Sequence, residues 1–298
     1  MKKLTFEAKY LNPLTDFGFH KLFGTESCKE LLIDFLNEII TEEGLITDIQ
    51  YLPPEQLGNF ETDRKAIFDI FCINENNEYF IVEMQKARQA FFRDRSIYYA
   101  SLPIQKQAPQ GDWTFQLKAV YFVAILDFVL FDELEEDRNQ VVEHVCLMRE
   151  STKTPYSGKL KFAFVELPKF NKREEELETH FDKWLYLLKH LPELKDRPVL
   201  VQGEIFKKLL QLAEIKRLTE KDMETYKKSV TDYYDVQLAM DYAREEAFEK
   251  GIEKGRNEAR KEEKIFVIQK CLQMNLPVET IVNLTGYSKE QITRLANK

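Results

Sequence analysis

The sequence predicts an α/β or α+β protein in which helices cover one mixed sheet. Five or six segments with the alternating or continuously apolar pattern of β-strands fall within the first 170 residues. Amphipathic helical segments precede and interrupt these strands, and from about residue 171 the pattern is helical. These observations indicate a layered sheet domain followed by a helical C-terminal region.

The helices and strands that we expect are separated by turn residues. Two helices at 11–23 and 25–40 come first, divided by Gly24. Strands are expected at 45–52, ended by Pro53 and Pro54, and at about 65–73 and 79–85, followed by a helix within 86–108. Residues 117–131 are apolar on both faces, as in a central strand, and further strands are expected at 141–150 and 159–167.

The C-terminal third is expected to be helical. Helices are predicted at 177–191 and 204–218, and a long polar helix from Thr219 through Met274 carries the alternating charges FEKGIEKGRNEARKEEK on an exposed face. The final PVETIVNLTGYSKEQITRLANK has helix start and stop signals at Pro277, Gly286 and Ser288. It predicts a helix-turn-helix hairpin, which either reads DNA in the major groove or serves in dimerisation or docking.

We therefore expect a sheet domain over residues 1–200 and a helical C-terminal region over 201–298, the latter used for homo-oligomer assembly or partner contact. The chain has 298 residues, 44% hydrophobic and 32% charged, which is typical of a globular protein. The formal net charge of −8 excludes a uniformly basic nucleic-acid-binding protein, so any nucleic-acid contact must be a local patch.

The sequence has no pattern typical of a targeting segment, a disulfide framework or a zinc site, which favours a reducing cytoplasm. No run approaches the length of a membrane span, and the N-terminal MKKLTFEAKYLNPLTDFGF lacks the apolar core and cleavage site of a signal peptide. The four cysteines have no CxxC spacing, and the four histidines form no HxxxH. This argues against a zinc site and a disulfide framework, and we expect a cytoplasmic protein that does not contact membranes.

Two acids stand out in the stretch RKAIFDIFCINENNEYFIVEMQK, residues 64–86, because each interrupts an apolar strand. If NENNE is the hairpin loop, Ile73 faces Tyr79, and Asp69 then lies opposite Glu83. Directly opposed Cβ atoms lie roughly 4.5–5.5 Å apart, so the two carboxylates would share one small space. Alternatively, the register differs by one residue, or one acid protrudes into solvent at a sheet edge.

A cation between the two acids would offset their repulsion. Hard oxygen ligands without histidine or cysteine nearby favour Mg²⁺ or Mn²⁺ bound by Asp69 and Glu83. A divalent ion held in this way is suited to polarising a phosphodiester and activating a water molecule. Gln85 lies on the same face and can orient that water, but it supplies no positive charge, a role that Lys65 could take instead.

A cluster of cations follows the acids on an expected helix. Arg88, Arg93 and Arg95, together with Tyr98 and Tyr99, can contact phosphates or stack on bases, which would give an acidic protein a local nucleic-acid-binding patch. Equally, tyrosines at this spacing pack against a sheet in many proteins.

The ordered motifs resemble a known family. An N-terminal acid, an Asp on one strand and Glu-x-Gln on the next resemble the PD-(D/E)XK nuclease superfamily with Gln in place of its usual Lys. TDFGFHKLFG, LLIDFLNEII, DRKAIFDIF, FIVEMQ, FFRDRSIYYAS and the Glu-Lys-Gly tetrads resemble the bacterial recombination-promoting nuclease and putative transposase family over most of the chain.

The resemblance implies a restriction-endonuclease-like core and a metal-dependent DNA endonuclease associated with transposition or recombination. Asp69 and Glu83 match the metal-holding acids, Gln85 matches the position of the catalytic lysine, and Asp16 matches an N-terminal acid that is a further metal ligand or water orienter. The missing lysine keeps a second interpretation open, a catalytically weak or inactive DNA- or protein-binding module on the same fold. A structural scaffold built on the charged helix is a third.

Overall fold

The computed structural model describes residues 8–40, 45–56, 66–108 and 114–296. The chain divides into two compact units, Met1–Gln237 and Leu238–Lys298, which are described separately below. The first unit contains the sheet and the acid pair, and the second is helical.

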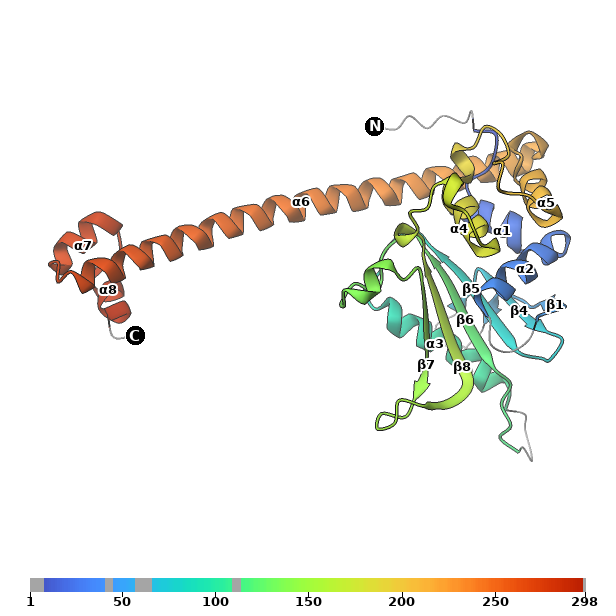
Figure 1. Ribbon diagram of the computed structural model, residues 1–298, viewed down its shortest axis with the longest axis horizontal. Coiled ribbons are helices and arrows are strands. Elements are labelled where there is room, and N and C mark those ends of the chain that lie inside the picture. Colours follow the sequence, from blue (N-terminus) through green and yellow to red (C-terminus); the bar gives the residue numbers. More distant parts are fainter. Residues whose placement is uncertain (1–7, 41–44, 57–65, 109–113, 297–298) are drawn as a thin grey trace. The chain divides into compact units, whose positions relative to one another are not determined.

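A six-stranded mixed sheet forms the centre of the first unit (Figure 1). Its order is β1–β4–β5–β6–β8–β7; β5, β6 and β8 are parallel neighbours, and the other pairings are antiparallel. The strands are β1 Ile49–Tyr51, β4 Ile70–Asn74, β5 Tyr79–Gln85, β6 Val120–Leu126, β7 Val142–Met148 and β8 Pro155–Glu166. Every residue of β6 is buried, because it has parallel neighbours on both edges and helices on both faces, as its continuous apolar run predicts.

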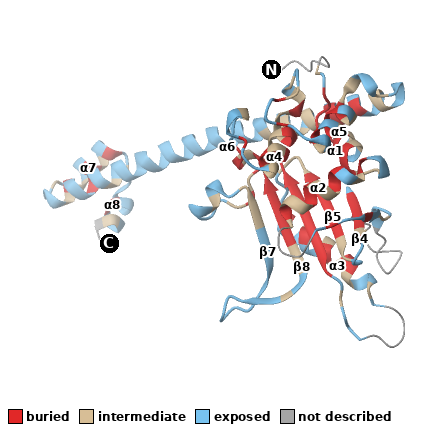
Figure 2. Cartoon of the chain, turned by 45° about the vertical axis from the view of Figure 1, so that its right-hand side comes forward, coloured by how far each residue is buried: buried red, intermediate tan, exposed pale blue. Residues whose placement is uncertain are grey.

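Helices cover both faces of this sheet. One face packs against α1 Asp16–Phe23, α2 Lys29–Ile39, α4 His180–His190 and α5 Glu204–Ala213 in a large apolar core, and the other packs against α3 Phe92–Lys106. In Figure 2 the strands of the sheet are mostly in the buried colour. The predicted mixed sheet flanked by helices is confirmed, and it is consistent with a restriction-endonuclease-like core. Short 3₁₀ helices lie at Glu26–Cys28, Glu136–Asn139, Leu167–Lys169, Glu174–Glu176, Leu191–Glu193 and Ile215–Arg217.

One expected strand is divided in two. Instead of a single strand at 65–73, β3 (Ala66–Ile67) pairs with β2 (Glu55–Gln56), and β4 begins only at Ile70. Between them the N–H of Phe68 donates to the carbonyl of Pro54 over 3.1 Å, and Asp69 forms a bend. Phe68 therefore does not lie on the face of Ile70, as strict alternation along one strand would require: Phe68 packs in the core on the α3 side, and Ile70 packs in the core on the other side.

The first strand is shorter than expected because side chains take its backbone donors. The N–H of Ile46 donates to Oδ1 of Asn37 over 2.8 Å. The N–H groups of Thr47 and Asp48 donate to the carboxylate of Glu75 over 3.2 and 3.3 Å. Only Ile49–Tyr51 then pairs with β4.

A single long helix, α6, runs from Glu220 to Gln273, close to the predicted span. Its first turns belong to the sheet unit, where Tyr226 and Val230 join the apolar core. From Leu238 onward its residues are largely exposed. No helix in the ranges that the model covers combines the length and apolar character needed to cross a membrane.

The second unit ends in the predicted helical hairpin. Helix α7 (Val278–Thr285) ends at Gly286 in the left-handed conformation, and α8 (Lys289–Ala296) follows. The predicted capping box is present: the N–H of Ser288 donates to Oε1 of Gln291 over 2.9 Å, and the N–H of Gln291 donates to Oγ of Ser288 over 3.3 Å. A small apolar core joins α7 and α8 to the end of α6 through Ile268, Cys271, Ile281 and Ile292.

Candidate active site

The two acids meet at the end of a β-hairpin. Strands β4 and β5 pair in the register that the sequence predicts, with Ile70 opposite Val82. One further step along the ladder brings Asp69 opposite Glu83. The alternative register, displaced by one residue, is therefore excluded.

Two hydrogen bonds from backbone N–H groups hold the carboxylates of the acids in place. The backbone N–H of Asp69 donates to Oε1 of Glu83 over 3.2 Å, and the backbone N–H of Met84 donates to Oδ2 of Asp69 over 2.8 Å. Where the backbone pairing of β4 and β5 ends, the Asp69 carboxylate, rather than a backbone carbonyl, thus accepts the hydrogen bond from the N–H of Met84. The Glu83 side chain is 3% exposed, whereas Asp69 is exposed, so one acid of the pair does reach solvent.

Both carboxyl groups hold protons more tightly than usual. Burial raises the pKa of Glu83 to about 8, and the neighbouring Asp69 carboxylate acts in the same direction. Although Asp69 as a residue is exposed, desolvation by the surrounding protein raises the pKa of its carboxyl to about 6, with a further contribution from Asp16. Near neutral pH without a cation, the pair therefore retains a proton.

Gln85 contacts the same acid. Its Nε2 donates to Oε2 of Glu83 over 3.1 Å, and its backbone carbonyl accepts from the N–H of Asp127 over 2.9 Å. The amide is a neutral donor, so it orients the Glu83 carboxylate without neutralising it. The predicted proximity of Gln85 and Glu83 is present in the structure.

Arg95 approaches Glu83 from α3, toward the same carboxylate oxygen that Gln85 contacts. Its Nη2 lies 3.9 Å from Oε2 of Glu83, and its Nη1 donates to Oε1 of Gln89 over 2.5 Å. The guanidinium carbon lies 5.2 Å from the ring centroid of Phe92 and 5.4 Å from that of Tyr99. Of the four cations predicted to bind nucleic acid, Arg95 is the one for which the structure records an ion pair with the acid pair.

Asp16 lies near the pair but is engaged by a lysine. It opens α1, and its Oδ1 is 2.7 Å from Nζ of Lys86. Its charge still contributes to the raised pKa of Asp69, which indicates proximity. Asp16 is therefore available at the rim of the site, with its side chain 70% exposed, rather than between the two acids.

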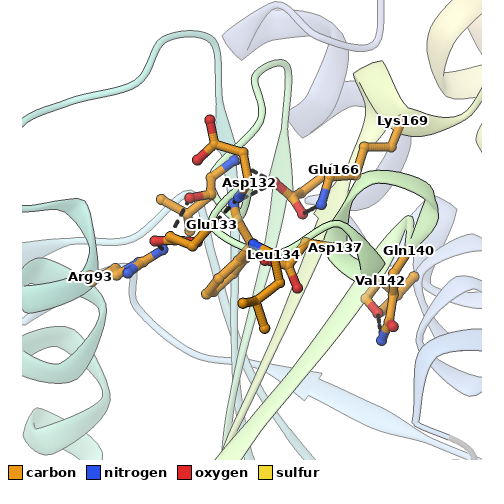
Figure 3. Close-up of polar contacts among 11 residues, drawn as sticks. Arg93, Asp132, Glu133, Leu134, Asp137, Gln140, Val142, Glu166 and Lys169 are labelled. Carbon is orange, nitrogen blue, oxygen red and sulfur yellow. Dashed lines mark hydrogen bonds and ion pairs between the residues drawn. The ribbon is translucent and has the colours of Figure 1, made fainter.

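The remaining predicted cations differ in their surroundings. Arg93 holds the segment after β6 (Figure 3): its Nη2 donates to Oε1 of Glu133 over 2.6 Å and to the carbonyl of Leu130 over 3.1 Å. Arg88 is exposed in the turn before α3. Lys65 lies outside the described residues.

The donor set fits a hard divalent cation. Asp69 and Glu83 offer carboxylate oxygens only, and desolvation, together with repulsion from a neighbouring carboxylate, raises the pKa of both. Within the described ranges no group of three or more His, Cys, Asp or Glu side chains is placed to hold a metal. The chain would therefore hold an ion through two acids, leaving other coordination positions to water and substrate.

Contacts from α6 brace this end of the sheet, and no local pattern of residues predicts them. The Tyr233 hydroxyl donates to Oδ2 of Asp127 over 2.7 Å, and Nε2 of Gln237 donates to the same oxygen over 3.1 Å. Gln237 also donates to the carbonyl of Lys86 over 3.3 Å. The helix thus contacts the residues that directly follow Gln85 and β6.

Comparison with known proteins gives one result. Residues 13–243 match the family model described as "PD-(D/E)XK nuclease family transposase". The match begins before Asp16, includes all of the acid pair and its neighbours, and ends shortly after the first compact unit. No match was found among curated proteins or among solved structures.

Proposed function

The chain belongs to the PD-(D/E)XK nuclease family transposases, and from this premise we propose that it is a Mg²⁺- or Mn²⁺-dependent DNA endonuclease acting in transposition or recombination. The observation that supports this most directly is the geometry at the end of the hairpin, where the N–H of Asp69 donates to Glu83 and the N–H of Met84 donates to Asp69. It brings two carboxyl groups together in a desolvated setting that disfavours their charge. We propose Asp69, Glu83, Gln85 and Asp16 as the catalytic set.

In the proposed reaction Asp69 and Glu83 would hold the ion. When bound, it supplies polarisation of the phosphodiester and a lower pKa for a nearby water. Gln85 keeps the Glu83 carboxylate oriented through its amide, and Asp16 keeps Lys86 at the rim. Because the pKa of Glu83 is about 8 in the ion-free protein, binding of a cation releases a proton at neutral pH.

The test is incubation of the purified protein with plasmid DNA and Mg²⁺ or Mn²⁺. We expect Asp69→Ala and Glu83→Ala to lower the cleavage rate at least about 100-fold, the order of loss when a key group of an active site is removed. Asp132→Ala, which removes an exposed acid from the segment after β6, is the matched control and should cleave like wild type. Calorimetric titration with the metal should show binding to wild type and a loss in both site variants.

A second function class is favoured by one observation, the neutral Gln85 at the position of the family's catalytic lysine. A DNA- or protein-binding module would bind DNA without cutting it under any metal condition, with or without Glu83. A structural scaffold would neither bind nor cleave. Binding measured alongside cleavage, with wild type and the two site variants, separates these three outcomes.

We further propose that residues 1–200 carry the nuclease function and that 201–298 serve assembly as a homo-oligomer, in the cytoplasm. The compact sheet unit itself continues to Gln237, since α5 and the first turns of α6 contribute core residues such as Phe206 and Tyr226. Sedimentation of the full chain beside a variant with Phe248→Asp, an exposed position of α6, tests the assembly proposal.

A further inference from the structure

The acid pair lacks a positive group on its own strand. A phosphodiester under attack gains negative charge, and fixed cations or donors aimed at that charge contribute strongly to catalysis. Gln85 donates to Glu83 but carries no charge. A cation from another element has to take this role if the site is complete.

Two cations of the described chain lie close enough to influence the pair. Lys86 directly follows Gln85, but its Nζ is 2.7 Å from Asp16 and the side chain is only 14% exposed. It is thus committed to a carboxylate. Arg95 is different: its closest carboxylate oxygen, on Glu83, lies 3.9 Å away, beyond hydrogen-bond length.

The Arg95 guanidinium is held in place while part of its donor capacity is unused. Nη1 is bound by Gln89, and the group lies over the rings of Phe92 and Tyr99. Its Nε is buried and has no hydrogen-bond partner among the residues that the structure describes. A buried N–H without a partner is unusual and calls for a missing acceptor.

An anionic ligand would meet the exposed part of this guanidinium. A guanidinium presents its N–H groups as a planar fork that binds two oxygens of one phosphate. The side chain is 29% exposed, so a ligand can reach it, and Glu83 fixes its distance from the acid pair. Stacking on Phe92 and Tyr99 orients the fork before the ligand arrives.

We propose that Arg95 is the phosphate-binding cation of this site and supplies from α3 the positive charge that Gln85 cannot supply from β5. The inference rests on the proposed nuclease function, and it names the residue that binds the negatively charged substrate. Arg95 would contact a phosphate oxygen of the DNA at the acid pair. Lys65, which was also predicted to provide this charge, lies outside the described residues, so that prediction stays untested.

The experiment compares Arg95→Gln with wild type in two measurements. One is the single-turnover cleavage rate with Mg²⁺ or Mn²⁺, which should fall about 100-fold or more. The other is the salt dependence of DNA binding in Ca²⁺, where log Kd against log salt should lose a slope of about 0.7–0.9, the value for one phosphate contact. Arg95→Lys keeps the charge and should recover the slope together with part of the cleavage.

A matched control removes the same charge elsewhere. Arg173 is 79% exposed, pairs with Glu176 and has no role in the site, so Arg173→Gln should match wild type in both measurements. If Arg95→Gln unfolds, Arg95→Met retains the apolar stem over Phe92 and Tyr99 and gives the same two readouts.

Each result decides one point. An unchanged salt slope in the neutral Arg95 variant overturns the inference, even if cleavage falls, because Arg95 then acts without binding phosphate. Cleavage within about threefold of wild type also overturns it. If wild type itself binds DNA but cleaves nothing, the proposed function fails while the salt slope still tests the phosphate contact.

Discussion

Glu83→Gln should stabilise the metal-free protein at alkaline pH. The buried carboxyl has a pKa of about 8 in the folded chain against an ordinary value of 4.5. At about 1.4 kcal/mol for each tenfold change in a protonation constant, ionising Glu83 within the fold costs up to about 5 kcal/mol. A neutral amide of nearly the same shape removes this cost.

The raised pKa of Glu83 also determines how the stability of the folded protein changes with pH. The folded state holds the Glu83 proton more tightly than the unfolded chain, so the penalty is absent below about pH 4.5, grows as pH rises, and is complete above pH 8. Urea unfolding with EDTA should therefore show wild type and Glu83→Gln close in stability at pH 5. At pH 8.5 the variant should be more stable by about 2–5 kcal/mol, since the Asp69 charge remains.

Glu133 offers a control of opposite sign. Its hydrogen bond from Arg93 lowers the pKa of its exposed carboxyl, so the folded state favours the ionised form and Glu133→Gln should lose rather than gain stability at pH 8.5. A Glu83→Gln variant that is equally or less stable than wild type at pH 8.5 would refute the assignment of Glu83 as a buried, uncompensated acid.

Three further predictions concern metal binding at the acid pair, a buried ion pair and a helix end. Mg²⁺ or Mn²⁺ at 100 times its Kd should stabilise wild type by about 2.7 kcal/mol in thermal unfolding and leave Glu83→Gln nearly unaffected; equal shifts in both would argue against ligation by Glu83. Glu166→Gln should destabilise by about 3–5 kcal/mol in urea, because Nζ of Lys169, 2.6 Å from Oε2 of Glu166 (Figure 3), would be left buried and unpaired, whereas adding Lys169→Met should recover much of the loss. Gly286→Ala should cost about 1–2 kcal/mol through its φ of +74° alone, since an added Cβ meets nothing within 4 Å; unchanged helix melting by circular dichroism would contradict this.

The acid pair was predictable because it depends on short-range rules. A five-residue loop and strict alternation fix which residues of neighbouring strands oppose each other, and both hold for Ile70 and Val82. The buried run of β6 and the Ser288 capping box follow from equally local patterns. Such features depend on residues close together in the chain, so tertiary packing does not change them.

The surroundings of the pair could not be predicted in this way. Arg95 reaches Glu83 only because α3 starts at Phe92, after a turn in which Phe91 adopts a left-handed φ of +62°, rather than continuing from residue 86. The contacts of Tyr233 and Gln237 join residues more than 100 positions apart. Before β4 the N–H of Met84 donates to the side chain of Asp69 and not to a backbone carbonyl. The alternation of residues along a strand does not predict such a side-chain acceptor.

The groups around the acids divide by charge in a way that favours cation binding. The donors that contact the carboxylates directly are neutral: the N–H of Asp69, the N–H of Met84 and the amide of Gln85. They fix geometry and leave the negative charge in place. The positive groups stand further out, with Arg95 at 3.9 Å and Lys86 bound to Asp16. A lysine at position 85 would place an ammonium within hydrogen-bond reach of Glu83, whereas glutamine adds no positive charge, so a divalent ion that displaces the retained proton binds both acids without a competing cation at that position.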